Sequence, residues 1–229
     1  MGRRVDVHAG LFYGGNMLKI YAIPVSLYCA KLRILLRHKG LNWQEVPPPG
    51  GYGSDEYKQI VPSGNLPAMV QAELLLADSE AIAEYLNETN PSPAMLPDDV
   101  ALRAKSRALG RFHDTRLEPA LRALFGQIKP ENRKQDVLSE GGKVISRHLA
   151  VLASLRADAG LPKDQLYLCD CGLAITFEWI ASFEKHMGLP IVWPDEITQY
   201  RKDLAALPAV AREYADYLPK LAAYMKENS

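Results

Sequence analysis

Residues 18–40 read LKIYAIPVSLYCAKLRILLRHKG, and the pattern of this segment indicates the fold class of the first part of the chain. Leu18 to Ile23 is a short apolar run that predicts a strand, and Ala30 to Lys39 carries leucines at helical spacing. The helix should end at Gly40, because a cationic last turn followed by glycine is typical of a helix C-terminus. A strand that leads directly into a helix predicts the opening of a β-α-β unit.

The alternation of strands and helices continues to about residue 89. The predicted elements are a strand at 42–46, a short helix at 55–60, a hairpin at 67–71 and 74–76, and a helix that begins at Asp78 or Ser79. A proline- and glycine-rich loop at 47–53 separates the second strand from the short helix. We therefore expect an α/β domain over residues 17–89 with the element order βαβαββα.

A purely helical pattern follows a proline-rich linker at 90–98. The predicted helices are 101–125, 131–159, 172–186, 196–207 and a last one that ends near residue 227. Pro119 should kink the first of them. Residues 99–227 are therefore predicted to form an all-helical bundle.

Composition narrows the functional classes. The 229 residues include 27 Lys and Arg, 27 Asp and Glu, and 48% apolar side chains, so no net charge draws the chain toward nucleic acid or a membrane surface. Three cysteines in a chain of this size indicate a reducing, cytoplasmic setting rather than a disulfide framework. Residues 1–16 show no clear periodicity and are left out of the fold prediction. We expect a small molecule as the partner.

Three short strings, taken together, resemble the cytosolic glutathione transferase family in its serine-type, bacterial-like form. They are Ser26-Leu27-Tyr28-Cys29-Ala30-Lys31-Leu32-Arg33, Pro62-Ser63-Gly64-Asn65-Leu66-Pro67-Ala68-Met69 and Leu76-Ala77-Asp78-Ser79-Glu80-Ala81-Ile82. The likeness extends over nearly all of residues 17–227. It implies a glutathione transferase fold with a thioredoxin-like first domain, a homodimer, and glutathione as co-substrate without a metal or redox cofactor.

The resemblance also implies roles for single residues. Ser26 stands where family members carry the catalytic Ser or Cys, and Pro67 stands where they carry a cis-proline. The residues that would bind glutathione are Asn65, Leu66 and Pro67 along its backbone, Asp78 and Ser79 at its γ-glutamyl group, and Lys58, Gln59 or Asn65 at its glycyl carboxylate. The last assignment stays open, because the loop at 47–53 lacks an obvious cation.

Thiol chemistry gives an independent reason to look at Ser26. Only the thiolate is a good nucleophile, and a free cysteine thiol has a pKa of about 8.5. Lowering that pKa by about 2 units requires about 2.7 kcal/mol of preference for the anion. One hydroxyl that donates to the anion supplies roughly 1.5–3 kcal/mol, and a helix N-terminus supplies about 0.3–1 kcal/mol. Ser26 lies at the predicted start of a helix and could stabilise a thiolate, cap the helix, or do both.

Other candidate residues keep two interpretations. Cys29 is either a packing thiol or the reactive group of a reductase, while Cys169 and Cys171 are expected to be core thiols because no metal-type spacing surrounds them. The predicted helix 101–125 should line the second-substrate pocket, with a contribution from the region of Trp193. Its residues Arg107, Arg111 and Thr115, at i, i+4 spacing, either face this pocket or belong to a solvated face.

The expected function is conjugation of the glutathione thiolate to a hydrophobic electrophile. Two alternatives remain open at this point. One is another glutathione-dependent reaction, either isomerisation or a thiol reduction through Cys29. The other is a non-catalytic module of the same fold that binds ligands or proteins.

Overall fold

The computed structural model describes residues 17–228, so the extension at 1–16 lies outside the described residues. The first part contains β1 (Leu18–Tyr21), α1 (Leu27–Lys39), β2 (Trp43–Val46), α2 (Asp55–Lys58), β3 (Ala68–Gln71), β4 (Leu74–Ala77) and α3 (Ser79–Thr89). The second part contains α4 (Val100–Phe112), the π-helix η1 (His113–Leu117), α5 (Glu118–Arg122), the 3₁₀ helices η2 (Phe125–Gln127) and η3 (Pro130–Asn132), α6 (Gln135–Ala159), α7 (Leu168–Met187), α8 (Asp195–Ala206) and α9 (Pro208–Asn228). The predicted thioredoxin-like order βαβαββα, followed by helices, is confirmed.

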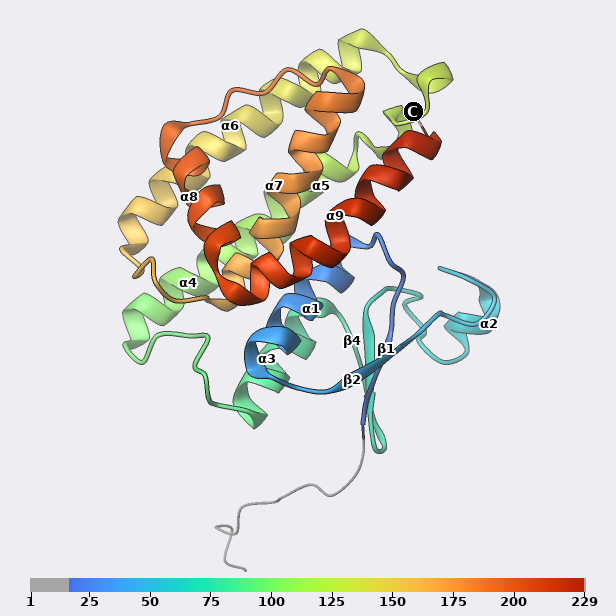
Figure 1. The fold of residues 1–229 in the computed structure, drawn as a ribbon, viewed down its shortest axis with the longest axis vertical. Helices are drawn as coiled ribbons and strands as arrows, with labels where there is room; N and C mark the ends of the chain where they lie inside the picture. Colours follow the sequence, from blue (N-terminus) through green and yellow to red (C-terminus); the bar gives the residue numbers. More distant parts are fainter. Residues whose placement is uncertain (1–16, 229) are drawn as a thin grey trace, which may run out of the picture.

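The sheet has four strands in the order β2-β1-β3-β4. β2 runs parallel to β1, whereas β3 is antiparallel to β1 and β4 is antiparallel to β3. The register places Ile20 opposite Met69, and both side chains are buried. Figure 1 shows the helical part stacked against this sheet-bearing part, with α1 between them.

α1 is buried on nearly all of its circumference, and its ends are capped as the sequence predicts. Ser26 is its N-cap, and Gly40 ends it in the left-handed conformation at φ 63°. The helix packs against α3 on one side and against α7 and α9 on the other. Even Lys31 and Arg33 are buried, so both cations need paired anions to offset their lost hydration.

The predicted helix 101–125 is interrupted. α4 and α5 are separated by the π-helix η1, which ends two residues before Pro119. Proline has no N–H to donate to the carbonyl four residues earlier, and a local π-turn is one way for a helix to accommodate that loss. The sequence predicted a kink at Pro119, and the structure has a wider turn immediately before it.

Within residues 17–228, none of the helices is both long enough and apolar enough to cross a membrane.

Candidate active site

A cavity of about 660 Å³ lies between the sheet-bearing part and the helical part. Its lining comes from three groups of elements: the turn into α1 contributes Ile23, Val25, Ser26, Leu27 and Tyr28, the remaining loops of the first part contribute Tyr52, Asn65, Leu66, Asp78 and Ser79, and the helical part contributes Arg111, Asp114, Thr115, Arg122, Phe125, Trp179 and Tyr224. The cavity is therefore lined by residues of all three strings from the sequence analysis and by residues of the helical part.

Ser26 is half-buried at the cavity wall and caps α1. Its Oγ accepts a hydrogen bond from the backbone N–H of Cys29 at 3.3 Å, and a hydroxyl that accepts one bond can still donate its own proton. The helix ladder begins with the bond from Ala30 N to the Ser26 carbonyl at 3.0 Å, which leaves the N–H groups of Leu27 and Tyr28 ahead of the first turn. No acidic side chain lies in this first turn to oppose an anion. Capping and anion binding are compatible here.

The loop before β3 presents backbone groups to the same cavity. The Leu66–Pro67 peptide bond is cis, and Leu66 and Asn65 line the cavity while Pro67 does not. The Asn65 carbonyl accepts a hydrogen bond from the Tyr57 hydroxyl at 2.9 Å. Within the described residues, neither the N–H nor the C=O of Leu66 has a hydrogen-bond partner.

Lys58 and Gln59, two of the three candidates for binding the glycyl carboxylate, do not line the cavity. Lys58 packs its stem over Gly64 and approaches the Asp55 carboxylate at 3.8 Å. Gln59 is exposed beyond the end of α2. Of the three candidates, only Asn65 faces the cavity.

Asp78 and Ser79 lie at the start of α3 and line the cavity. Asp78 is the N-cap, and its Oδ1 accepts the N–H groups of Glu80 at 2.9 Å and Ala81 at 3.0 Å. Its backbone has φ 94°, a strained value for a residue with a side chain, and such strain concentrates at ligand sites. Within residues 17–228, the second carboxylate oxygen of Asp78 and the hydroxyl of Ser79 have no hydrogen-bond partner, so both could bind a ligand.

Two of the three polar residues expected to line the second-substrate pocket do so. Arg111 and Thr115 line the cavity, whereas Arg107 lies outside it and hydrogen-bonds Glu84 of α3 at 2.8 and 3.1 Å. Among the described cavity-lining cations, Arg111 makes no side-chain hydrogen bond or ion pair, while Arg122 is paired with Glu118. Trp193 does not line this cavity; its indole N–H donates to Glu184 and its ring packs on Phe177.

A largely buried network of polar side chains reaches the cavity at Asp114. Asp114, at the start of the π-helix, accepts from Lys31 at 3.2 Å and from His113 at 2.7 Å. Lys31 also donates to Glu80 at 2.6 Å. Burial alone would lower the pKa of Lys31, but the carboxylates of Glu80 and Asp114 outweigh burial and raise it, so this cation stays charged. The network joins α1, α3 and η1 at the cavity.

Two other reactive groups beside Ser26 are poorly suited to the chemistry. Burial and the nearby Glu118 carboxylate raise the pKa of Tyr28 far above its usual value, so its hydroxyl is a weak acid already engaged by that anion. Cys29 is only 2% exposed, and burial raises the pKa of its thiol. Cys169 and Cys171 are buried free thiols, as expected.

The aromatic wall of the cavity, formed by Phe125, Trp179 and Tyr224, could not be predicted from the sequence. Trp179 comes from α7 and Tyr224 from α9, and both lie far in sequence from the strings that mark the site. Their periodicity is that of ordinary core positions, which carries no signal of a cavity. Asp114 was not singled out, although it follows Arg111 by three residues, a spacing that places two side chains on one face of a helix.

Comparison with known proteins agrees with this architecture. A sequence profile of the glutathione S-transferase N-terminal domain matches residues 20–94. The chain is 28% identical to glutathione S-transferase Z1 of Arabidopsis thaliana over 70% of this chain and 76% of the relative. It is 30% identical to the GST-like protein YibF of Escherichia coli strain K12 over 69% of this chain and 79% of that protein.

Among solved structures, a maleylacetoacetate isomerase from Anaeromyxobacter dehalogenans superposes with a TM-score of 0.68 at 25% identity, over 90% of this chain and 94% of that one. The likeness thus covers both the sheet-bearing part and the helical part. On its fold, its profile match and its identity to these relatives, the chain belongs to the glutathione S-transferase family.

Proposed function

We propose that the protein is a serine-type glutathione transferase in which Ser26 stabilises the glutathione thiolate. The position of Ser26 carries the proposal: its hydroxyl lies at the cavity wall, at the N-terminus of α1, with its oxygen already accepting the Cys29 N–H. The hydroxyl donates to the sulfur, and the unpaired N–H groups of the first turn and the helix dipole add to the preference for the anion. Together these contributions supply the ~2.7 kcal/mol that a thiolate at neutral pH requires.

The rest of glutathione would lie along the first part of the chain. The free N–H and C=O of Leu66 bind the cysteinyl unit as an added strand would, with Asn65 beside them and Pro67 fixing the bend. Asp78 binds the γ-glutamyl ammonium through its free oxygen, and Ser79 binds the γ-glutamyl carboxylate at the N-terminus of α3.

The thiolate then attacks an electrophilic carbon held against the helical wall. A carbon–sulfur bond forms, and either a leaving group departs with its electron pair or the resulting carbanion takes a proton from water. The apolar body of the electrophile packs on Phe125, Trp179 and Tyr224, and Arg111 binds an anionic group such as a carboxylate. Thr115 lies one turn along the same wall and can accept or donate a hydrogen bond.

Glutathione-dependent isomerisation is the second candidate. The solved neighbour at 25% identity is a maleylacetoacetate isomerase, and a structure of that isomerase carries dicarboxyethyl glutathione and citrate in its active site. The unpaired Arg111 in the cavity is suited to a substrate with carboxylates of this kind. Isomerisation uses the same thiolate, which adds to a double bond and leaves again, so Ser26 keeps its role.

Thiol reduction through Cys29 is disfavoured, because the thiol is buried and its pKa is raised. We place the reaction in the cytoplasm, where glutathione stays reduced. The homodimer remains a prediction, tested by the mass of the protein in solution.

The test of the proposed function is Ser26→Ala. Loss of thiolate stabilisation should lower kcat/KM for conjugation by about 10²-fold. The matched control is Ser54→Ala, because Ser54 caps α2 through the Tyr57 N–H at 3.0 Å in the same way but lies outside the cavity. That variant should keep its activity. Equal activity in wild type and Ser26→Ala would refute the role of Ser26, and a wild type that neither conjugates nor binds immobilised glutathione would favour a non-catalytic module.

A further inference from the structure

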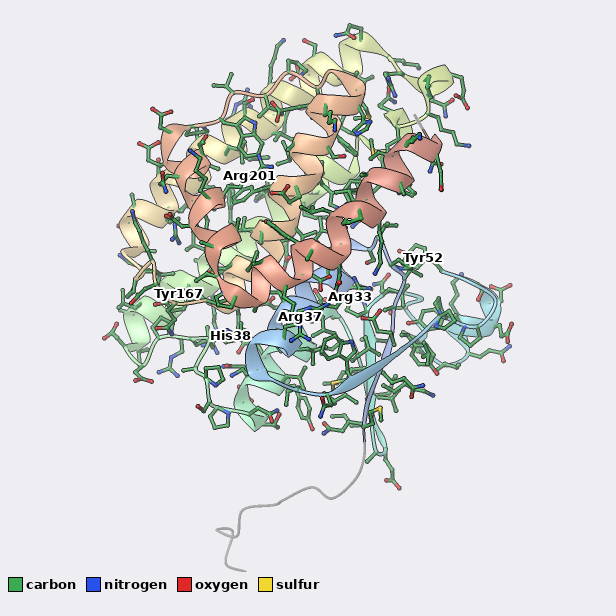
Figure 2. The ribbon with its side chains drawn as sticks, viewed as in Figure 1. Arg33, Arg37, His38, Tyr52, Tyr167 and Arg201 are labelled. Atoms are coloured by element: carbon green, nitrogen blue, oxygen red, sulfur yellow. The ribbon has the colours of Figure 1, made fainter. Side chains whose placement is uncertain are left out.

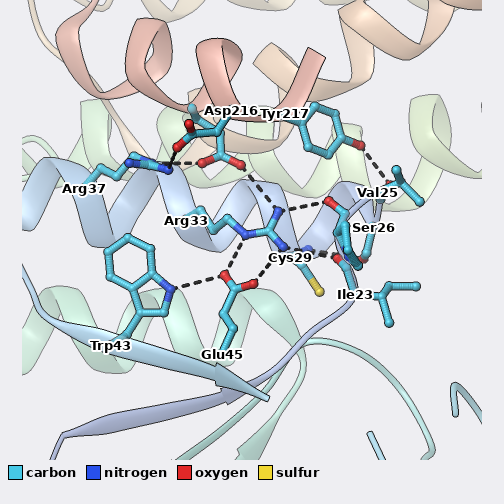
Figure 3. Close-up of polar contacts among 12 residues, drawn as sticks. Ile23, Val25, Ser26, Cys29, Arg33, Arg37, Trp43, Glu45, Asp216 and Tyr217 are labelled. Carbon is cyan, nitrogen blue, oxygen red and sulfur yellow. Dashed lines mark hydrogen bonds and ion pairs between the residues drawn. The ribbon is translucent and has the colours of Figure 1, made fainter. Parts of the chain in front are cut away.

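The turn before Ser26 is fixed by hydrogen bonds from side chains that do not line the cavity. The carbonyl of Ile23 accepts from Arg33 Nη2 at 3.2 Å, and the carbonyl of Pro24 accepts from Arg33 Nη1 at 3.3 Å. The next carbonyl, that of Val25, accepts from the Tyr217 hydroxyl at 2.9 Å. Three consecutive carbonyls directly before Ser26 are therefore bound by side chains, as Figure 3 shows.

Arg33 is itself fixed by two carboxylates. Glu45 of β2 takes a bidentate pair of bonds from it at 2.6 and 3.0 Å, and Glu213 of α9 accepts from it at 3.4 Å. Glu213 is only 1% exposed and also accepts from Arg37 at 2.9 Å. Figure 2 shows Arg33 and Arg37 on α1 beside α9. A bidentate guanidinium held on both sides has little freedom, so the two carbonyls it binds are held as well.

Tyr217 follows Glu213 by one helical turn on α9 and is also buried. Its hydroxyl donates to Val25 and accepts from the indole N–H of Trp179 at 2.7 Å. Trp179 lines the cavity and stacks on Phe125 with ring centroids 4.8 Å apart. A continuous line of contacts thus runs from the wall of the second-substrate region through Tyr217 to the residue before Ser26.

We propose that α9 positions the catalytic hydroxyl: Tyr217 directly, and Glu213 through Arg33, fix the turn at 23–25 so that Ser26 is aimed at the thiolate. This rests on the proposed function of Ser26. Neither Tyr217 nor Glu213 lines the cavity, so we assign both as positioning residues. Their effect arises because a hydroxyl contributes to an anion only at hydrogen-bond distance and alignment, and a displacement of about 1 Å forfeits much of the contribution.

The direct test is Tyr217→Phe, which removes one hydroxyl and keeps the ring. The pKa of enzyme-bound glutathione, followed by the ultraviolet absorbance of the thiolate, should rise by at least about 0.5 unit, a threefold change in the ionisation constant. The matched control is Tyr214→Phe. Tyr214 lies on the same helix, and its hydroxyl donates to the backbone carbonyl of Ala174 at 2.8 Å, not to the turn at 23–25. The control should leave the pKa of bound glutathione unchanged.

A double variant separates positioning from a general loss of structure. When Ser26 is already Ala, adding Tyr217→Phe should not raise the pKa of bound glutathione further, because the hydroxyl that Tyr217 aims is gone. An additive rise would overturn the proposal. If Ser26→Ala raises the pKa and Tyr217→Phe does not, positioning fails and the function of Ser26 stands; if Ser26→Ala has no effect, both fail.

A second pair of variants keeps the proposal testable if Tyr217→Phe does not fold. Glu213→Gln weakens the hold on Arg33 and should also raise the pKa of bound glutathione by at least about 0.5 unit. Asp216→Asn is its control, because in the described part of the chain Asp216 pairs with Arg37 and not with Arg33. Equal values in these two variants would contradict the positioning role of α9.

Discussion

At the scale of single residues, the chemistry depends on which of two like side chains faces the cavity. Arg107 and Arg111 are one helical turn apart on α4, yet Arg107 is paired with Glu84 outside the cavity, whereas Arg111 lines the cavity and has no ion pair with any residue that the structure describes. The sequence could not separate them, because i, i+4 spacing places both on one side of the helix. The two arginines differ because Glu84 of α3 lies within reach of Arg107 but does not pair with Arg111.

This difference gives a prediction about substrate preference. Arg111→Gln should raise KM for an electrophile that bears a carboxylate by about 10-fold, which corresponds to one hydrogen bond to a charged group. A neutral electrophile of the same size should be nearly unaffected, as should either substrate in the control Arg107→Gln. Steady-state kinetics with the substrate pair checks this, and equal losses for both electrophiles in Arg111→Gln would contradict an anion-binding role.

At the scale of elements, α1 and α9 are joined by a buried ion-pair cluster. Glu213 accepts from Arg33 and Arg37 and is almost inaccessible, so removing it leaves two cations without one of their anions. Glu213→Ala should therefore lower the free energy of unfolding by about 3–5 kcal/mol.

The control for this prediction lies on the same helix. Asp216 also pairs with Arg37 but is 57% exposed, so Asp216→Ala should cost only about 0–1 kcal/mol. Urea denaturation measures both variants. Similar losses for the two would mean that burial of Glu213 does not set the strength of the cluster.

The elements also show what sequence patterns can predict. Strands and caps follow local rules, so Ser26, Gly40 and the hairpin at β3 and β4 were predictable from residue type and spacing. The π-turn at η1 was not, because proline signals a break without specifying its geometry. The aromatic wall depends on how α7 and α9 pack, which is a long-range outcome that no local pattern records.

At the scale of the whole molecule, titratable ion pairs act both between the two parts and inside the first one. Asp114 of η1 pairs with Lys31 of α1 across the boundary, and Glu45 of β2 pairs with Arg33 of α1 within the sheet-bearing part. Burial alone would raise the pKa of Asp114 and of Glu45, but the hydrogen bond from His113 with the charge of Lys31, and the pairing with Arg33, outweigh burial and hold both pKa values below their usual range. A carboxyl group with a lower pKa in the folded chain adds stability above its unfolded pKa of about 4. That stability is lost as the pH falls through the folded value.

The free energy of unfolding should therefore decrease as the pH is lowered from about 5 toward 3. The decrease should be shallower in Asp114→Asn, which cannot titrate at this position. Denaturant unfolding across this pH range measures the slope. Identical slopes in wild type and variant would contradict a contribution from the charge of Asp114.

The central claim, that Ser26 holds the sulfur of glutathione as an anion at the start of α1, is tested most directly by a crystal structure of the complex with glutathione. The distance to measure is that between the glutathione sulfur and Ser26 Oγ. We predict a hydrogen-bond contact, with the peptide backbone of the ligand along Leu66 and its γ-glutamyl end at Asp78 and Ser79. A sulfur that instead contacts Cys29 or Tyr28, or that lies beyond hydrogen-bond reach of Ser26, would contradict the account.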